Sequence, residues 1–413
     1  MRRIHSFYLF DEEINGGKMI FLSGPRQVGK TTFVKGRLKE VGCEDLYFNW
    51  DDPYVRREYA RNPHFLKAYL AKPRKEKPLV AFEEIHKHRA WKNVLKGLYD
   101  LHSAEAQFII TGSARLDFFR QSGDSLVGRY FPYRMLPAGL AEVADDFHFV
   151  QKDAKFLSAP GPGGYLPLLQ RVPEKPFKET FERLMRFSGF PEPYLKAREE
   201  FSRKWRKIYQ SLLIGEDLRE LSRIGDIKGI EQLLLLLPER VGSPLSVNSL
   251  REDLQVAHKT VVNWLEALKK IYLVFSISPW EGTLSRAIRK ESKYYFFDWT
   301  MVKGEGPQFE NALALGLLRF LCRLNEQGAG DFDLHYVRTR EGHEVDFLIT
   351  YDRKPLVLIE AKARERSLTR SVSYFSRLLS VPCFQVVWKL DDAEEHPGER
   401  FVVPAWRFFA LLG

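Results

Sequence analysis

The sequence predicts an α/β protein made of several domains, and three observations support this. The chain has 413 residues, which is more than one hydrophobic core normally serves. Its apolar fraction of 44% and charged fraction of 29% are those of a folded protein. Over residues 1–145, short apolar runs alternate with helical patterns, as they do in a parallel sheet covered by helices.

Four apolar runs in residues 1–145 have the length of buried strands, and helical patterns separate them. The expected strands are Met19–Ser23, Asp45–Trp50, Pro78–Phe82 and Phe108–Thr111. The expected helices are Thr32–Glu40, Tyr54–Ala60 and Trp91–Leu101. Each strand would run in the same direction, so that all carboxyl ends meet at one edge of the sheet.

The rest of the chain changes pattern three times. Residues 146–240 hold a Gly/Pro-rich stretch and then amphipathic helical patterns, and we expect a helical lid or linker there. Residues 241–300 have two short helical patterns followed by a strand, and residues 301–413 return to mixed β and α. We therefore expect four domains, covering residues 1–145, 146–240, 241–300 and 301–413.

Composition restricts the compartment and the partners. The three cysteines lie far apart, which favours a reducing compartment without a disulfide framework. No apolar run reaches the ~18 residues that span a bilayer, so we expect a cytoplasmic protein with no membrane partner. The net charge of +10 is modest and spread along the chain. It is compatible with DNA as a partner and equally with a plain solvated surface.

A phosphate-binding loop is the strongest motif in the chain. It matches G-x-x-x-x-G-K-[ST], with an apolar strand before it and an amphipathic helix after it. Loop N–H groups would surround the β-phosphate of ATP, Lys30 would bridge the β- and γ-phosphates, and Thr31 would ligate Mg²⁺. The expected ATP-binding residues are Gly24, Pro25, Arg26, Gln27, Val28, Gly29, Lys30, Thr31 and Thr32.

Two carboxylates at the end of the strand Leu79–Phe82 are the expected partners of the loop. Glu83 would hold the Mg²⁺, usually through water, and Glu84 would act as the general base on the attacking water. The usual pair is Asp-Glu, and Glu83 is longer by one methylene, ~1.5 Å. From the sequence alone, aspartate at this position should serve as well or better.

Three further residues are candidates for contact with the γ-phosphate. Phe108–Thr111 ends in small polar residues, and Thr111 or Ser113 could touch the phosphate or the attacking water. Arg129 is the best candidate for an arginine that senses the γ-phosphate, within one chain or from a neighbouring subunit. The second case would make the protein a homo-oligomer.

The segment Val247–Lys270 has the spacing of a helix–turn–helix. Val247–Leu254 and His258–Lys270 are the two helices, with Gln255–Ala257 as the turn. The second helix could enter a DNA major groove, and the basic segment Arg286–Lys293 could be a wing that touches phosphates. Such modules also serve as protein-docking surfaces or rigid connectors.

The last domain contains an acidic residue and an E-x-K motif on successive apolar strands. Asp346 follows Glu344-Val345, and Glu360 and Lys362 end the strand that begins near Pro355. Alternation along a strand puts Glu360 and Lys362 on one face, where Asp346 and Glu360 could share a Mg²⁺ and Lys362 could activate water. Glu310 is a further candidate ligand. The alternative is a nuclease-like fold that is kept as a binding scaffold without cleavage.

Taken in order, these motifs resemble a family of bacterial and archaeal AAA-type ATP-binding proteins. The resembling segments are Gly24–Thr32, Phe82–His86, Thr111–Ser113, Leu126–Arg129, Ser188–Glu192, Tyr295–Asp298, Phe309–Asn311, Glu344–Asp346 and Ile359–Lys362. The resemblance implies a P-loop AAA-type parallel-sheet domain, a helical and winged-helix middle region, and a C-terminal α/β restriction-endonuclease-like domain of the PD-(D/E)-x-K type. It implies no established substrate.

We therefore expect a magnesium-dependent ATPase that couples its nucleotide state to a winged-helix and nuclease-like module acting on DNA. The alternative belongs to another class of protein. It is a nucleotide-gated switch that binds a protein partner and carries a catalytically inactive nuclease-like scaffold.

Overall fold

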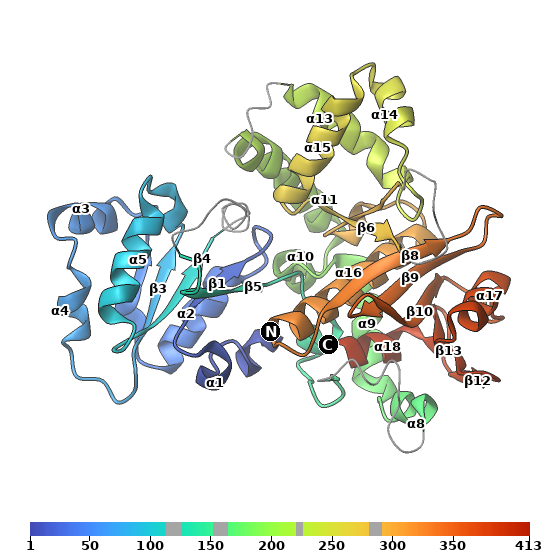
Figure 1. Ribbon diagram of the computed structural model, residues 1–413, viewed down its shortest axis with the longest axis horizontal. Helices are drawn as coiled ribbons and strands as arrows, with labels where there is room; N and C mark the ends of the chain where they lie inside the picture. The colour runs from blue at the N-terminus through green and yellow to red at the C-terminus, as the bar shows by residue number, and fades with distance from the viewer. Residues whose placement is uncertain (113–125, 152–163, 220–225, 281–290) are drawn as a thin grey trace. The chain divides into compact units, whose positions relative to one another are not determined.

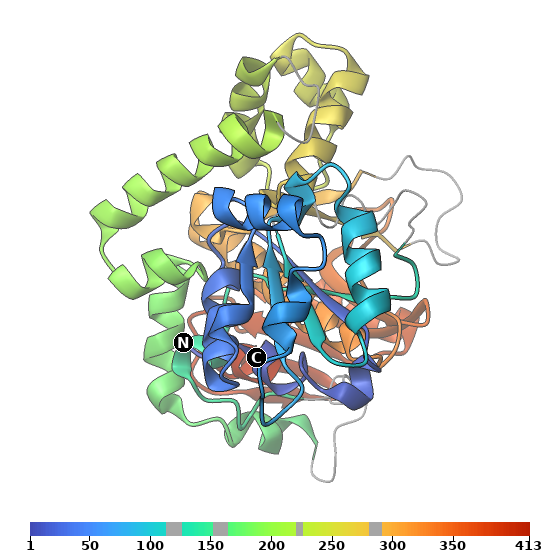
Figure 2. The same cartoon turned by 90° about the vertical axis from the view of Figure 1, so that its left-hand side faces the viewer.

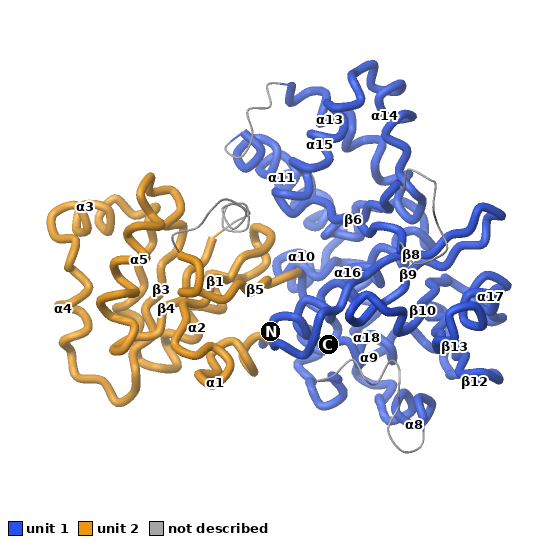
Figure 3. The backbone as a smooth tube through the Cα atoms, in the orientation of Figure 1, with its two compact units in different colours: residues 1–2, 137–413 blue, residues 3–136 orange. Residues whose placement is uncertain are grey.

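The computed structural model describes residues 1–112, 126–151, 164–219, 226–280 and 291–413. It divides into two compact units, residues 3–136 and residues 137–413 together with residues 1–2 (Figure 3). Residues 137–145, which the sequence places in the first domain, thus belong to the larger unit. The finer division into four domains stays a prediction.

The smaller unit is built on a five-stranded sheet in the order β2-β3-β4-β1-β5, and all its pairs are parallel (Figure 1). Helices pack around this sheet (Figure 2). The strands are β1 (Met19–Ser23), β2 (Tyr47–Asn49), β3 (Leu79–Glu83), β4 (Gln107–Thr111) and β5 (Tyr130–Arg134). The helices are α1 (Glu12–Asn15), α2 (Lys30–Glu40), α3 (Pro53–Arg61), α4 (Leu66–Leu70) and α5 (Trp91–His102).

This arrangement confirms the expected α/β fold with a parallel sheet, its four expected strands and its three expected helices. The central strands β1, β3 and β4 are largely apolar and buried, and in β1 every residue is buried. The fifth strand, β5, has no counterpart in the sequence prediction. It contains Pro132, and among the described strands it pairs with β1 alone, at the edge of the sheet, where a residue without an N–H donor is tolerated.

The larger unit holds a mixed eight-stranded sheet in the order β12-β13-β11-β10-β9-β8-β6-β7. The strands are β6 (Val274–Pro279), β7 (Lys293–Phe296), β8 (Phe332–Arg338), β9 (Glu344–Tyr351), β10 (Lys354–Lys362), β11 (Cys383–Val387), β12 (Glu394–His396) and β13 (Arg400–Pro404). Strands β6 and β7 belong to the segment 241–300, yet they extend the sheet of the C-terminal region through the pairing of β6 with β8.

Helices surround this sheet and also form a separate group before it in the chain (Figure 1). The helices of the larger unit are α7 (Leu140–Ala144), α8 (Tyr165–Gln170), α9 (Glu174–Phe187), α10 (Pro191–Lys196), α11 (Glu199–Leu212), α13 (Ile227–Leu236), α14 (Val247–Leu254), α15 (His258–Lys270), α16 (Glu305–Glu326), α17 (Arg370–Leu379) and α18 (Ala405–Leu412). The long helix α16 contacts β7, β8 and β10, whereas α17 packs on β9 and β10.

Buried polar contacts fix α16 in place. The Asn311 side chain accepts a hydrogen bond from the Phe296 N–H and donates one to the Phe296 carbonyl oxygen, both at 2.7 Å. Further along the same helix, Arg319 forms a buried ion pair of 3.0 Å with Glu142 of α7. These contacts tie α16 to β7 and to α7, since a buried amide or charge is costly without its partner.

No helix among the described residues has the length and apolar character that crossing a membrane requires.

Candidate functional site

The phosphate-binding loop begins directly after the buried strand β1, at the carboxyl edge of the sheet. Gly24 has φ 142°, and a Cβ atom on it would lie 2.1 Å from the carbonyl oxygen of Met135. No other residue could therefore take this position without moving the backbone after β5. The close approach explains the first glycine of the motif.

The end of the loop turns its backbone toward the start of α2. Gln27 and Gly29 have φ of 58° and 102°, both in the left-handed region, and α2 begins at Lys30. A left-handed residue just before a helix start brings successive N–H groups together, which is an anion-binding arrangement. Val28 is fully buried and anchors the loop, while Gln27 is exposed.

The Lys30 ammonium folds back over the loop. Its Nζ donates to the carbonyl oxygens of Gly24 at 2.8 Å and of Pro25 at 2.7 Å. Phosphate oxygens are stronger acceptors for an ammonium than neutral carbonyls. Lys30 is thus held at the loop in a position from which it can turn to a nucleotide.

Glu83 joins three elements of the smaller unit. Thr31 of α2 donates to its Oε1, and Tyr47 of β2 donates to its Oε2. Burial raises the pKa of Glu83, and the hydrogen bond from Thr31 partly offsets this. The structure thus brings together the hydroxyl and the carboxylate that the sequence assigns to Mg²⁺, and the extra methylene of glutamate serves to reach both partners.

Glu84 follows β3 with φ 55°, a backbone conformation that is uncommon for a residue with a side chain. Its N–H donates to the Thr111 carbonyl oxygen at 3.0 Å. Its Oε2 lies 3.4 Å from Lys87 Nζ and 3.5 Å from His86 Nε2. The turn therefore directs Glu84 away from the strand axis, and its carboxylate is held by a cation on the next turn.

The expected polar residues after β4 are placed only in part. Thr111 ends β4, is buried, and lies in register with Glu83 on one side and with Leu22 on the other. It therefore lies between the phosphate-binding strand and the acidic strand. Ser113 lies outside the described residues.

Arg129 is not brought to the phosphate-binding loop of its own chain. It precedes β5, whose first residue pairs with Met19 at the start of β1, so four strand residues, ~13 Å, separate it from the loop edge. Its guanidinium pairs instead with Asp100 of α5 at 2.8 Å. A role in a neighbouring subunit stays a prediction.

Arg134 lies closer to the phosphate-binding loop than Arg129 does. It is the last residue of β5, it is exposed, and it pairs in register with Ser23 at the entrance to the loop. The signal that could have revealed it is the parallel pairing of β5, which carries its last side chain to the carboxyl edge.

In the larger unit, the four residues predicted for a nuclease site do lie together. Asp346 Oδ2 accepts from the Ala361 N–H at 3.0 Å, and Glu360 Oε2 accepts from the Asp346 N–H at 3.3 Å. Lys362 Nζ lies 2.8 Å from Glu360 Oε1. Burial, together with the negative charge of Asp346, raises the pKa of both Glu360 and Glu310.

The sequence missed a second lysine at the centre of this group. Lys293 begins β7, and its side chain is fully buried beside Glu310, Glu344 and Asp346. The sequence prediction placed it instead at the end of a basic wing touching phosphates. Tyr295, two residues further on, donates to Glu310 Oε1 at 2.8 Å. We call Lys293, Glu310, Glu344, Asp346, Glu360 and Lys362 the carboxylate cluster.

The two expected helices and the turn between them are present as α14 and α15. Gln255 between them has φ 54°, which makes the tight turn, and Val261, Trp264, Leu265 and Leu268 of α15 are buried. Lys259 and Asn263 on the same helix are exposed. Residues 281–290, which hold most of the expected wing, lie outside the described residues.

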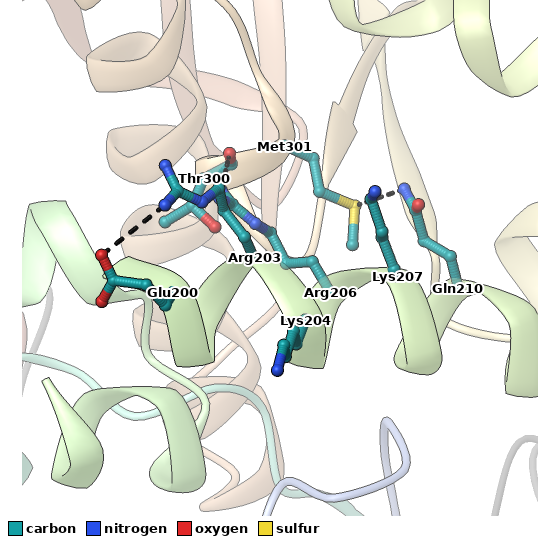
Figure 4. A pocket seen from close by; sticks show the side chains of 8 residues that line it. All are labelled: Glu200, Arg203, Lys204, Arg206, Lys207, Gln210, Thr300 and Met301. Carbon is teal, nitrogen blue, oxygen red and sulfur yellow. Dashed lines mark hydrogen bonds and ion pairs between the residues drawn. The ribbon is translucent and has the colours of Figure 1, made fainter. Parts of the chain in front are cut away.

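A basic pocket that no sequence motif indicated lies along α11. Its volume is about 600 Å³, and its walls are Glu200, Arg203, Lys204, Arg206, Lys207, Gln210, Thr300 and Met301. Arg203, Arg206, Lys207 and Gln210 point toward Thr300 and Met301, whereas Lys204 points to the other side of α11 (Figure 4). Among the described residues, Lys204 and Lys207 form no ion pair, so the lining carries an excess of positive charge.

Three family models match the chain. Residues 16–144 match an AAA domain, residues 178–303 a domain of unknown function (DUF8612), and residues 305–408 a second domain of unknown function (DUF4143). The last two descriptions name no activity. The first coincides with the sheet and the loop of the smaller unit.

The chain also resembles uncharacterized proteins and a solved structure, each at low sequence identity. An uncharacterized protein of Methanocaldococcus jannaschii is 27% identical over 300 residues, which is 68% of this chain but only 60% of the relative. A second uncharacterized protein of that organism is 24% identical over 88% of this chain and 79% of its own length. The Orc1 protein of Aeropyrum pernix, solved in complex with DNA, is 15% identical over 73% of this chain and 88% of its own, with a TM-score of 0.29.

A likeness of that TM-score carries no conclusion about fold or function. The family match over residues 16–144 and the geometry of Gly24, Lys30, Thr31 and Glu83 are independent of it. Together they support a nucleotide-binding P-loop domain of the AAA type in the N-terminal part of the chain.

Proposed function

We propose that this protein is a magnesium-dependent ATPase of the AAA type whose nucleotide state controls a C-terminal region that contacts DNA. The observation that carries the ATPase proposal is the contact of the Thr31 hydroxyl with the Glu83 carboxylate. It joins the phosphate-binding loop to the acidic end of β3. The P-loop supplies the amides and the ammonium for the phosphates, and Glu84 lies next to Glu83 as the candidate base.

Hydroxyl and carboxylate oxygens are the donors that Mg²⁺ prefers, so Thr31 and Glu83 fit this ion. When bound, it would neutralise charge on the β- and γ-phosphate oxygens. Lys30 would leave its carbonyl acceptors for those oxygens. Glu84 would take a proton from the attacking water, and for this its carboxylate must be released from Lys87.

The first test is ATP affinity. Lys30→Ala should weaken ATP binding by about 100-fold, because the variant loses a charge-assisted contact with the phosphates. Isothermal calorimetry with Mg·ATP measures this. Lys39→Ala, which removes an exposed lysine from the other end of α2, is the matched control and should bind as the wild type does. Equal affinities in the two variants would refute the proposed ATP site.

Contact with DNA is supported by the basic pocket along α11. Four cationic side chains and one carboxylate line it, and Gln210 and Thr300 add polar groups. Arginine, lysine and glutamine are typical donors to backbone phosphates. The pocket lacks aromatic side chains, which stacking on single-stranded bases would need. These features favour the phosphate backbone of duplex DNA.

The test of this second step is DNA-stimulated ATP turnover. Duplex DNA should raise the turnover of the wild type, and Lys204→Gln/Lys207→Gln should reduce the stimulation and flatten its dependence on salt. The control Lys303→Gln/Lys354→Gln removes two exposed lysines elsewhere in the same unit. Turnover that DNA leaves unchanged would refute the DNA step while leaving the ATPase proposal in place.

A second candidate function is favoured by one observation, the burial of Lys293 among the carboxylates that a nuclease would use. In this case the C-terminal region binds a protein partner and cleaves nothing. A protein that co-purifies in an ATP-dependent manner would support it, together with ATP turnover that is insensitive to DNA. Cleavage of duplex, single-stranded or branched DNA with Mg²⁺ or Mn²⁺, lost in Asp346→Ala, would exclude it.

A further inference from the structure

Lys293 is a fully buried ammonium that lies between carboxylates of two other elements. Its Nζ is 2.8 Å from Glu344 and 3.2 Å from Asp346, both on β9, and 3.4 Å from Glu310 on α16. The side chain has no exposed surface. An ammonium has three N–H donors, and three carboxyl groups surround it here, so its hydrogen-bonding capacity is met by their oxygens.

These contacts keep Lys293 charged. Burial acts to lower its pKa, but the carboxylates of Glu310, Asp346 and Glu344 outweigh burial and raise the pKa above its ordinary value. A buried charge persists in a protein when it is paired and hydrogen-bonded, as this one is. The cluster therefore holds a permanent positive charge at neutral pH.

The remaining oxygens of Asp346, Glu360 and Glu344 already have partners. Asp346 and Glu360 accept backbone N–H groups, and the second oxygen of Glu360 is 2.8 Å from Lys362 Nζ. The second oxygen of Glu310 faces Gly242, at which an added Cβ would lie only 2.6 Å from it. Glu344 also pairs with Arg338 at 3.4 Å.

The geometry does not suit a divalent metal ion. Mg²⁺ requires near-ideal octahedral coordination at ~2.0–2.1 Å, whereas the Lys293 ammonium stands between Glu310 and Asp346 and would repel a second cation there. Among the described residues, no three His, Cys, Asp or Glu side chains are grouped so that they could hold a metal ion. Asp346 and Glu360, predicted from the sequence as metal ligands, thus do not fit that role in this arrangement.

We propose that the Lys293 ammonium is the built-in cation of the carboxylate cluster and takes the place that a divalent metal occupies in a nuclease site. The cluster then joins β7 to β9 and α16 as a permanent ionic link. It takes up no metal unless Lys293 is removed. This role is independent of whether the smaller unit hydrolyses ATP.

The test is Mn²⁺ binding by the nucleotide-free, full-length protein, followed by electron paramagnetic resonance. The wild type and Asp346→Asn should bind Mn²⁺ equally, because Asp346 holds no Mn²⁺ in the wild type. Lys293→Met, which keeps the length of the side chain without its charge, should gain a Mn²⁺ site at least about tenfold tighter than any in the wild type, because the repulsion is gone. The Asp346→Asn/Lys293→Met double variant should lose this gained site.

Lys362→Met is the matched control, because it removes the other lysine of the cluster, which pairs with Glu360 and is partly exposed. It should gain no site, since Lys293 remains. A wild-type Mn²⁺ site that Asp346→Asn abolishes would overturn the proposal, and so would a folded Lys293→Met that gains no site. If Lys293→Met does not fold, the comparison of wild type with Asp346→Asn decides: equal Mn²⁺ binding supports the proposal, and loss in Asp346→Asn overturns it.

Discussion

The P-loop and the carboxylate cluster each place a lysine near acidic groups, but the two ammonium groups have different acceptors. Lys30 donates to two neutral carbonyl oxygens of its own loop. Lys293 lies beside three carboxylates from other elements and is fully buried. Since a carboxylate holds an ammonium more strongly than a carbonyl does, we expect Lys30 to exchange these two carbonyl acceptors for a ligand and Lys293 to keep its carboxylates. The acceptors of a lysine, more than its motif, indicate whether it is available for chemistry.

The largest expected effect is a loss of folding stability, and it should differ between variants of these two lysines. Lys293→Met should lower the free energy of unfolding of the larger unit by about 3–5 kcal/mol, because buried carboxylates lose their counter-charge. Lys30→Met should lower that of the smaller unit less, by about 1.5 kcal/mol, because its partly exposed ammonium donates charge-assisted hydrogen bonds to carbonyl oxygens. Urea denaturation followed by tryptophan fluorescence measures both. Equal losses in the two variants would break the comparison.

The second prediction concerns Glu84, whose carboxylate must leave Lys87 before it can act as the general base. Glu84→Gln should keep ATP bound but slow its turnover by about 100-fold or more, as expected for a lost general base. Single-turnover hydrolysis together with calorimetry separates the two quantities. A variant with normal turnover would leave Glu84 with the structural role that its contacts with His86 and Lys87 already show.

Glu83→Asp should have a smaller effect, on the order of tenfold on turnover. The shorter side chain cannot keep both Thr31 and Tyr47 as partners, so the contacts reverse the expectation that the sequence alone suggests. Tyr47→Phe, which removes one partner and leaves the carboxylate intact, is the control and should cost less. Full activity in Glu83→Asp would mean that the strand end adjusts to the shorter acid.

The smallest effect is expected for Arg129. Arg129→Ala breaks an exposed pair with Asp100, and exposed pairs contribute little, so the ATP turnover of dilute protein should stay within about twofold of wild type. Arg134→Ala should reduce turnover more, since Arg134 ends β5 beside the loop. Turnover measured over a range of protein concentrations also tests the neighbouring-subunit role, because only that role makes the loss in Arg129→Ala depend on concentration.

The sequence predicted those parts of the fold and site that depend on local pattern. Met19–Ser23 and its loop were found because a buried strand, two glycines and a helix start follow one another. Strand β5 was missed because Pro132 argues against a strand unless its place at the sheet edge is known. The position of Arg134 was therefore missed as well.

Lys293 was missed for a different reason. Its neighbours in sequence are basic, which suggested an exposed wing, whereas its partners lie on α16 and β9, more than a dozen residues away. No local pattern carries the pairing of β6 with β8, which extends the C-terminal sheet toward the segment that holds Lys293. Contacts between distant segments depend on the order of the strands in the sheet. The spacing of residues along the sequence does not contain that order.

The position of Lys293 on β7 also determines where the gene can be cut without separating an ion pair. Lys293 lies within the match to the first domain of unknown function, residues 178–303, while Glu310, Glu344 and Asp346 lie within the match to the second, residues 305–408. A gene fragment cut between the two would leave the carboxylates without their principal counter-ion. The two segments should therefore be exchanged between proteins as one piece, and substitutions of Lys293 should be accompanied by changes among its three acidic partners.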